Sequence, residues 1–356
     1  MDTGDRTAIG RRKQTTARRV AYARRLGENA AMFLIIDGNN VAWAGYYALE
    51  RAMKPETPER RARVALLGLA GMALGAIARG GTPPGAPAEP VSRVALCFDE
   101  GRPLRRRQMY PRYQMTREED TKFTGNEPTI LGGIAAFTEM ATAMLPIDVL
   151  RMKNTEADDL IAGLVAKHPG IAKRIVSGDR DFLQLIGPKT TIYSPIKKVV
   201  VDEGNFFEQT APKTSSGERI AFPRERFLDY RTLVGDPSDT LAGVAGAGAL
   251  SAAKLVAAAP LDAYFGDAAA VRAALGRRSE PLERAFADGS AAAVVERNRT
   301  LMDLRLPAPC WDVLDAATTR GTWDRVAFEA WLREEKLSSV DPAVTIAQME
   351  RLAAAH

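Results

Sequence analysis

The sequence contains very few of the residues that build disulfide frameworks or zinc sites. Its 356 residues include two cysteines, Cys97 and Cys310, and two histidines, His168 and His356. The wide separation of the cysteines argues against a disulfide framework and indicates a reducing compartment. With so few thiols and imidazoles, no zinc site of the usual ligand spacing can be built. Any metal must therefore be held by oxygen ligands, which favours Mg²⁺ or Mn²⁺.

Long hydrophobic runs are also missing from the sequence. We identify no apolar segment that predicts a membrane span, and residues 1–31 lack the apolar core of a signal peptide. The composition, 46% hydrophobic and 26% charged, is typical of a soluble globular protein with one large or two smaller domains. We therefore expect a cytoplasmic protein that does not contact a membrane.

The net charge of +5 is unevenly distributed. Residues 1–31 hold eight of the 49 Lys and Arg residues and three of the 44 acids, which leaves 41 of each for the rest of the chain. This segment is predicted to be a disordered basic extension, and a phosphate-binding arm is the alternative. Because the remainder is balanced in charge, nucleic-acid binding must come from local patches.

Short apolar strands alternate with helical patterns through the first 200 residues. Strands are expected at 33–36, 94–98, 147–150 and 174–177, followed by a hairpin over 192–201. A polar turn is expected after the first strand. Helices are expected near 59–79, at 130–144 and after a cap at Asn154 or Thr155. This alternation predicts an α/β fold with a central, mainly parallel sheet flanked by helices.

Acidic residues gather where these strands end. Asp37, Asp99 and Asp179 each follow an apolar strand directly, and parallel strands deliver such residues to one edge of a sheet. Further acids stand at the intervening helix start and after the last of these strands: Glu156, Asp158, Asp159 and Asp181. Like charges this close repel one another, and a divalent cation would remove the repulsion. The sequence therefore predicts a metal site with carboxylate ligands at this edge.

Residues 102–117 are rich in arginine and contain no acid. The arginines are Arg102, Arg105, Arg106, Arg107, Arg112 and Arg117, with Tyr110 and Tyr113 between them. Arginine interleaved with tyrosine favours a channel for a single strand, where bases stack on aromatic rings and phosphates meet guanidinium groups. A solvated surface is the alternative.

A second constellation begins with Asp236 and Asp239. Gly243, Gly246 and Gly248 follow, and a pattern of small apolar residues then predicts a helix. Glycines at a helix N-terminus let backbone N–H groups approach a phosphate closely. This arrangement indicates a contact to the duplex backbone that does not read sequence; a tight helix–helix turn is the alternative.

In their order along the chain these blocks resemble the 5′-nuclease superfamily. That superfamily includes flap endonucleases, the 5′-nuclease domain of bacterial DNA polymerase I and phage 5′–3′ exonucleases. The matching blocks are Ile36-Asp37-Gly38-Asn39, Phe98-Asp99, Tyr113-x-x-x-Arg117, Glu156-Ala157-Asp158-Asp159, Ser177-Gly178-Asp179-Arg180-Asp181 and Gly235-Asp236-Pro237-Ser238-Asp239. Residues 192–198 also resemble the primer-removing phage nucleases called phage ribonuclease H. The resemblance covers about residues 33–256, and more loosely continues to 306.

The resemblance implies two-metal hydrolysis of phosphodiester bonds at 5′ ends or flaps of DNA, and of RNA primers, during replication. It implies two Mg²⁺ or Mn²⁺ ions per site. The residues implied for the first ion are Asp37, Asp99, Glu156, Asp158 and Asp159. Those implied for the second are Asp179, Asp181, Asp236 and Asp239. The expected catalytic residues are Arg117 and seven of these acids: Asp37, Asp99, Glu156, Asp158, Asp159, Asp179 and Asp181. The implied DNA contacts are the six arginines, Tyr110, Tyr113, Lys122, Gly243, Gly246, Gly248, Ser251 and Lys254.

The resemblance also implies a domain organisation and partners. A catalytic core at 32–220 would carry an arch at about 102–130. A helix–three-turn–helix subdomain, which binds K⁺ in relatives, would occupy 221–306, and a helical tail 307–356. We expect a monomer in a bacterial or phage-infected cell. Its partners would be DNA with a 5′ flap or end, RNA–DNA hybrid primers, and a single-strand-binding or clamp protein.

The sequence departs from the pattern at Gln114, where relatives often have lysine. Lys122 and Arg105 to Arg107 are the candidates to supply that positive charge. Two alternatives stay open. A PIN-type RNA-processing nuclease should lack the glycine-rich segment after Asp239, and a non-catalytic DNA-binding relative should have lost metal ligands.

Overall fold

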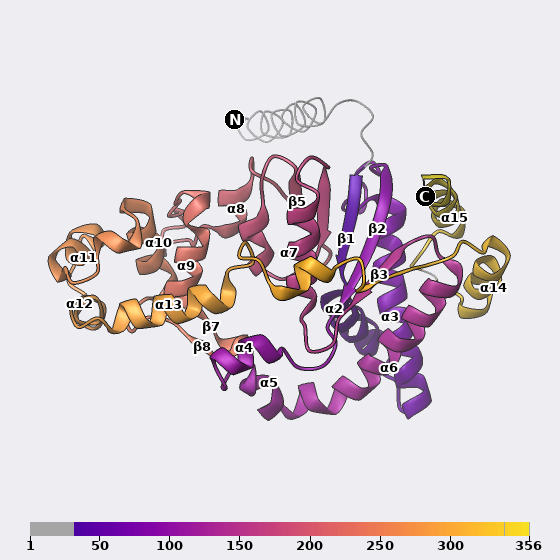
Figure 1. The fold of residues 1–356 in the computed structure, drawn as a ribbon, viewed down its shortest axis with the longest axis horizontal. Helices are drawn as coiled ribbons and strands as arrows, with labels where there is room; N and C mark the ends of the chain where they lie inside the picture. The colour runs from indigo at the N-terminus through magenta and orange to yellow at the C-terminus, as the bar shows by residue number, and fades with distance from the viewer. Residues whose placement is uncertain (1–31, 338, 356) are drawn as a thin grey trace, which may run out of the picture.

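The computed structural model describes residues 32–337 and 339–355, so the predicted basic extension at 1–31 lies outside the described residues. Within them a seven-stranded sheet has the order β6-β5-β4-β1-β2-β3-β9 (Figure 1). Its strands are β1 (Met32–Asp37), β2 (Val91–Phe98), β3 (Asp148–Arg151), β4 (Lys173–Val176), β5 (Thr190–Ser194), β6 (Val199–Val201) and β9 (Thr318–Arg320). β1 to β5 pair in parallel, and β6 and β9 add antiparallel edges. The predicted α/β fold with a mainly parallel sheet is confirmed.

The sheet is buried on both faces, which explains why β1 is apolar throughout. Phe33 and Ile35 point into one hydrophobic cluster, whereas Leu34 and Ile36 point into the other. Side chains of successive strand residues alternate between faces, and a parallel sheet covered on both sides needs apolar residues at every position. The last residue of β1 is an acid, Asp37, so the polar edge of the sheet begins there.

One face of the sheet is covered by α2 (Gly38–Met53), α3 (Pro58–Arg79), α6 (Thr121–Met144), α14 (Arg325–Glu335) and α15 (Pro342–Ala355), all of which contribute to one cluster. α7 (Ala157–Lys167) covers the other face. By length and composition α3 could cross a membrane, contrary to the expectation from the sequence. However, 56% of its most apolar window is buried inside the protein, which is the pattern of a core helix.

One helix is absent from the sequence predictions, and another begins earlier than predicted. The turn expected after the first strand is instead the start of α2, because the Asp37 carboxylate accepts a hydrogen bond from the Asn40 N–H at 3.0 Å and caps the helix. The helix predicted at 130–144 starts at Thr121, since Asp120 caps it. The first turns of α6 therefore belong to the segment predicted as the arch, together with α4 (Leu104–Met109) and α5 (Met115–Glu119).

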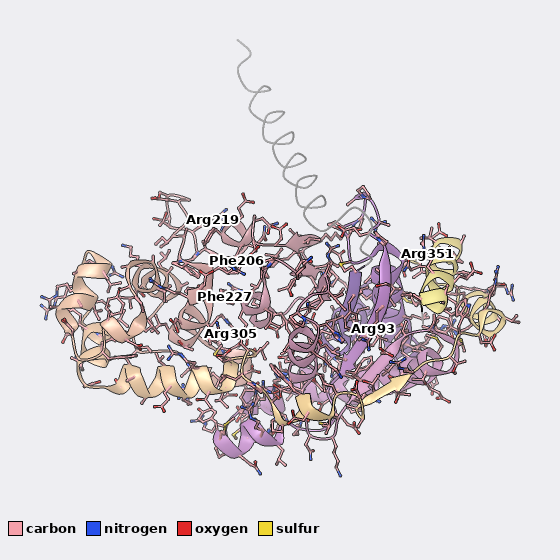
Figure 2. All side chains as sticks on the ribbon, turned by 45° about the horizontal axis from the view of Figure 1, so that its top comes forward. Arg93, Phe206, Arg219, Phe227, Arg305 and Arg351 are labelled. Atoms are coloured by element: carbon pink, nitrogen blue, oxygen red, sulfur yellow. The ribbon has the colours of Figure 1, made fainter. Side chains whose placement is uncertain are left out.

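A helical region follows the β5–β6 hairpin and lies to one side of the sheet (Figure 1). It contains α8 (Phe206–Thr210), α9 (Phe227–Val234), α10 (Ala249–Ala258), α11 (Ala268–Leu275), α12 (Glu280–Ala287) and α13 (Ser290–Met302), with the small pair β7 (Gly235–Asp236) and β8 (Leu241–Ala242). Phe206 and Phe227 join it to the sheet cluster, with ring centroids 5.6 Å apart (Figure 2). The sheet and the helical region thus share one hydrophobic core.

The C-terminal tail is not helical throughout, contrary to the prediction for 307–356. After a 3₁₀ turn at Pro309–Val313, β9 pairs with β3 and extends the sheet before α14 and α15. Trp311 in that turn donates a hydrogen bond from Nε1 to the Asp159 carbonyl oxygen at 2.8 Å. The tail therefore packs directly on α7, the helix that opens with three of the predicted metal ligands.

Candidate active site

The ends of three parallel strands and the start of α7 bring four carboxylates together. Asp37 ends β1, Asp99 follows β2, and Asp179 follows β4. Asp158 lies in the first turn of α7. Burial, followed by the charges of Asp179, Asp37, Glu156 and Asp99, raises the pKa of Asp158 well above its usual value. The strongest electrostatic neighbours of Asp158 are thus all acids, as the strand-end pattern predicts.

Short hydrogen bonds hold the strand-end acids in place. Ser177 Oγ donates to Asp37 at 2.8 Å, and the Ala157 N–H donates to Asp99 at 2.7 Å. Asp99 therefore caps α7 from a neighbouring strand, the role that the sequence suggested for Asn154 or Thr155. Burial raises the pKa of Asp37 to about 7, and the charges of Asp99 and Asp179 act in the same direction.

Glu156 and Asp159 differ from these acids because a buried arginine pairs with both. Arg106 Nη1 donates to Glu156 at 2.5 Å and to Asp159 at 2.8 Å, and its Nη2 reaches the other Asp159 oxygen at 2.9 Å. Burial raises the pKa of Glu156 to about 7, although the Arg106 charge opposes this shift. Arg106, predicted as a DNA contact, thus lies among the predicted metal ligands.

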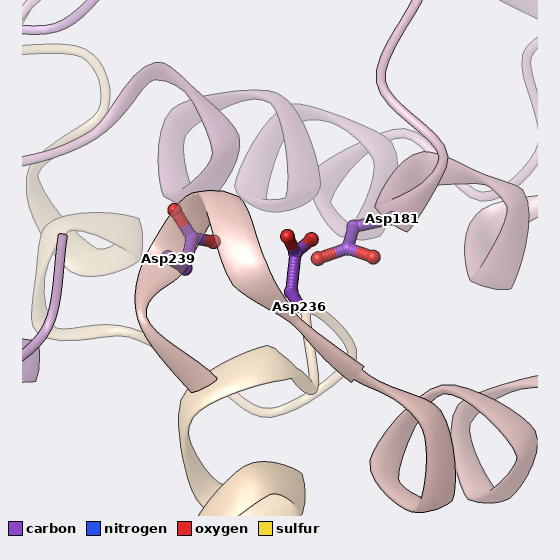
Figure 3. Close-up of side chains that lie close together, drawn as sticks. All are labelled: Asp181, Asp236 and Asp239. Carbon is purple, nitrogen blue, oxygen red and sulfur yellow. The ribbon is translucent and has the colours of Figure 1, made fainter. Parts of the chain in front are cut away.

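The remaining acids form a second group in which Asp181, Asp236 and Asp239 each offer an oxygen within 4.8 Å of the others (Figure 3). Asp181 opens the 3₁₀ turn after β4, while Asp236 and Asp239 flank the turn after β7. Burial raises the pKa of Asp181 to about 7, with Asp179 adding to the shift. Three such oxygens at this spacing could hold a hard divalent cation.

Arginines also contact this second group. Arg231 donates to Asp181 at 2.8 Å and to Asp236 at 2.6 Å. Burial opposes the ionisation of Asp236, but hydrogen bonds from Ser238 and the Arg231 charge hold its pKa below the usual value. Arg117, an expected catalytic residue, donates to Asp239 at 2.6 Å.

The predicted arch places its polar residues in three environments. Tyr113 is buried, and its hydroxyl donates to Glu156 and to Asp239 at 3.3 Å. Arg102 and Arg107 form ion pairs with Glu118. The other predicted DNA contacts here are at least partly exposed: Arg105, Tyr110, Arg112 and Lys122. These four partly or fully exposed side chains are accessible to a polynucleotide in solution.

Gln114, which replaces the expected lysine, also points into the acidic site. Its Nε2 donates to Glu156 at 2.7 Å and to Asp239 at 3.3 Å. The residue is 5% exposed and has a φ of +60°, a left-handed conformation that non-glycine residues adopt rarely. A neutral amide therefore bridges the two groups of acids at this position.

The glycine-rich segment leads into α10 as predicted. Gly248 occupies the N-cap position and is exposed. Gly243 packs so closely that an added Cβ would lie 2.3 Å from the Val234 carbonyl oxygen. Gly246 has a φ of +82°. Ser251 Oγ donates to the Gly246 and Gly248 carbonyls, and Lys254 Nζ donates to Leu275 O at 3.1 Å, so both predicted DNA contacts make bonds within the protein.

Sequence reasoning assigned no role to Arg231 or Ser177, although both contact the acids. Ser177 precedes the Gly178-Asp179 pair, so its place at a strand end could have suggested such a contact. Arg231 lies 50 residues from Asp181, and nothing in its local pattern distinguishes it from a surface arginine.

Comparison with known proteins identifies the family of the chain. Residues 32–211 match the family described as 5′-3′ exonuclease, N-terminal resolvase-like domain. DNA polymerase I of Mycobacterium bovis is 30% identical over 295 residues, which cover 82% of this chain and 29% of the polymerase. The thermostable DNA polymerase I of Thermus filiformis is 29% identical over 234 residues, 65% of this chain and 24% of that protein. The chain thus spans less than a third of the length of these relatives.

Solved structures share the fold. The T5 5′-exonuclease with bound zinc aligns with a TM-score of 0.53 at 16% identity, covering 86% of this chain and 99% of the phage protein. A T5 D15 flap endonuclease complex with DNA and metal ions aligns with a TM-score of 0.50 at 16% identity, covering 90% of this chain and 99% of the phage protein. Because the family match covers more than half of its residues, the chain belongs to the family described as 5′-3′ exonuclease, N-terminal resolvase-like domain.

Proposed function

We propose that this chain is a two-metal 5′–3′ exonuclease and flap endonuclease that removes 5′ ends or flaps of DNA, and RNA primers, during replication. The observation that carries the proposal is the gathering of carboxylates: Asp181, Asp236 and Asp239 each offer an oxygen within 4.8 Å of the others, and the strand-end residue Asp179 accepts a hydrogen bond from the Asp181 N–H. Buried acids of like charge are unfavourable together unless cations lie between them. Carboxylate oxygens are the ligands that Mg²⁺ and Mn²⁺ prefer.

The acids divide into two sets that fit such ions. Asp37, Asp99, Glu156 and Asp158 would hold the first ion, and Asp179, Asp181, Asp236 and Asp239 would hold the second. Asp159, which the sequence also predicts for the first ion, is left out because both of its oxygens accept hydrogen bonds from Arg106. When bound, the ions supply an activated water and stabilise charge on the leaving oxygen. The protein orients the acids through Ser177 and the Ala157 N–H. Arg117 and Tyr113 bring donors from the arch to Glu156 and Asp239.

DNA binding is supported by two surfaces. The exposed N-terminus of α10 at Gly248 offers backbone N–H groups to a phosphate of the duplex. In the arch, the exposed Arg112 and the half-buried Arg105 can contact phosphates of the displaced single strand. The T5 flap endonuclease of this fold was solved with DNA and metal ions, which supports DNA as the substrate class.

In this proposal residues 32–220 form the catalytic core, 221–306 the DNA-binding subdomain and 307–356 the tail. Several further points stay predictions. They are Mg²⁺ as the natural ion, K⁺ at Gly243–Gly248, the monomeric state, the cytoplasmic location, and a clamp or single-strand-binding partner.

A cleavage assay with matched substrates tests the proposal. One duplex carries a labelled 5′ flap, a second carries the same strand as a 3′ flap, and a third carries an RNA 5′ flap. With Mg²⁺ we expect cleavage near the junction of both 5′-flapped duplexes, and none of the 3′-flapped one. A chelator should abolish cleavage. Equal cleavage of 5′ and 3′ flaps, or activity that survives the chelator, would show that the proposal is wrong.

A further inference from the structure

Arg106 occupies a position that a phosphate cannot reach. Its side chain is 4% exposed, whereas Arg112, six residues further along the same segment, is exposed. Arg106 also donates from Nε to the Leu301 carbonyl oxygen at 3.0 Å, near the end of α13. Its guanidinium group is therefore enclosed by α4, the start of α7 and the end of α13. A DNA contact from this position would require the site to unpack.

The bonds of Arg106 fix the geometry of two predicted metal ligands. It binds both oxygens of Asp159, at 2.8 and 2.9 Å, and one oxygen of Glu156 at 2.5 Å. Bidentate pairing of a planar guanidinium group with a carboxylate sets orientation as well as distance. Asp159 belongs to the first turn of α7, and its carbonyl oxygen accepts a hydrogen bond from Trp311. It therefore anchors Arg106, which in turn sets the direction of Glu156.

The charge of Arg106 also matters for Glu156. The other donors to Glu156 are Gln114 and Tyr113, and both are neutral. Loss of Arg106 would leave two buried carboxylates without their shared cation, and removing one partner of a buried ion pair is strongly unfavourable. Glu156 would then rotate away from its present direction, and this change would weaken its binding of a divalent ion.

We propose that Arg106 is a positioning residue that holds Glu156 through Asp159 for metal binding, and that it does not contact the DNA backbone. This inference rests on the proposed two-metal function. It assigns different tasks to two arginines that look alike in the sequence: Arg106 supports the metal site, and Arg112 binds phosphate.

Three variants separate these tasks: Arg106→Gln, Arg106→Lys and the matched control Arg112→Gln. Mn²⁺ binding is measured by calorimetry, and binding of a 5′-flapped duplex is measured without divalent ions over a range of salt concentrations. Loss of a residue that orients metal ligands typically lowers metal affinity by about 10- to 100-fold, and we expect this for Arg106→Gln with unchanged DNA affinity. Arg112→Gln should retain Mn²⁺ affinity, bind DNA more weakly and show a salt slope lower by about one.

Arg106→Lys distinguishes positioning from charge alone. Lysine keeps the charge but cannot bind Asp159 and Glu156 with the same fork of donors, so we expect its Mn²⁺ affinity to stay closer to that of Arg106→Gln than to wild type. If Arg106→Gln does not fold, the Mn²⁺ and DNA affinities of Arg106→Lys test the inference instead. Weaker DNA binding with normal Mn²⁺ affinity in the Arg106 variants would overturn the inference, as would a loss of thermal stability alone. If the wild-type protein neither binds Mn²⁺ nor cleaves the flap, the proposed function itself fails.

Discussion

At the scale of single residues, the acids of the site differ in whether an arginine pairs with them. Arg106 pairs with Glu156 and Asp159, and Arg231 pairs with Asp181 and Asp236. Asp158, in contrast, is surrounded most strongly by carboxylates. Buried ion pairs add little net stability, but removing one partner leaves an uncompensated charge. The paired acids should therefore respond to loss of their arginine more strongly than surface acids do.

This reasoning predicts the effect of Arg231→Met, a substitution that keeps much of the side-chain volume. Loss of the cation should lower the free energy of unfolding of the metal-free protein by about 3 kcal/mol, measured by urea denaturation. Arg284→Gln, which removes an exposed pair with Glu280, is the control. Equal effects of the two substitutions would contradict the prediction.

The sequence predicts which acids lie at strand ends, but it does not predict which arginines pair with the acids of the site. Asp37, Asp99 and Asp179 follow short apolar runs, so their positions at the sheet edge depend on local pattern. The Arg106–Glu156 and Arg231–Asp181 contacts each join residues 50 positions apart. No local pattern encodes such a contact, and an arginine-rich segment is compatible with both a DNA surface and a buried ion pair.

At the scale of elements, α2 and α3 pack at a point where both lack side chains. A Cβ added to Gly68 would lie 2.5 Å from the Gly45 carbonyl carbon and 2.7 Å from its oxygen. Gly75 lies in the same helix, and an added Cβ there would meet nothing within 4 Å. Asp37, a residue of the acidic cluster, caps the start of α2, so this contact also fixes how the helix runs away from the cluster.

The two glycines should therefore respond to alanine in opposite directions. Gly68→Ala should lower the free energy of unfolding by about 1–3 kcal/mol, because the helices would have to separate. Gly75→Ala should raise it by about 0.5–1 kcal/mol, since alanine restricts the unfolded chain and favours helix. Chemical denaturation of the two variants provides the measurement. If Gly68→Ala is as stable as Gly75→Ala, the close approach of α2 and α3 is wrong.

Element boundaries were harder to predict than element types. The hairpin near 192–201 and the four parallel strands have strong β patterns, and all appear in the sheet. The predicted start of α7 is wrong because the Ala157 N–H, at the start of the helix, donates to Asp99, which follows the distant strand β2. β9 was missed because Thr318–Arg320 is short and polar, and becomes a strand only by pairing with β3.

At the scale of the whole molecule, the site lies where the sheet edge meets the helical region. The acids of the first group come from the sheet edge and α7, whereas Asp236 and Asp239 come from the turn after α9. A small apolar cluster attaches the arginine-rich segment to the helical region: Tyr113, Leu228, Leu241, Leu301 and Met302. The arginine-rich segment, the helical region and the carboxylates are therefore parts of one packed unit.

The rate of flap cleavage by Asp158→Asn tests the central claim most directly. In a single-turnover reaction with Mg²⁺ and saturating enzyme, we predict a rate at least about 100-fold below wild type, equivalent to about 3 kcal/mol of lost transition-state stabilisation. Binding of the same flapped duplex without divalent ions should be unchanged, because Asp158 is not among the proposed DNA contacts. A cleavage rate equal to that of the wild-type protein would contradict the assignment of this carboxylate cluster as the metal-dependent active site.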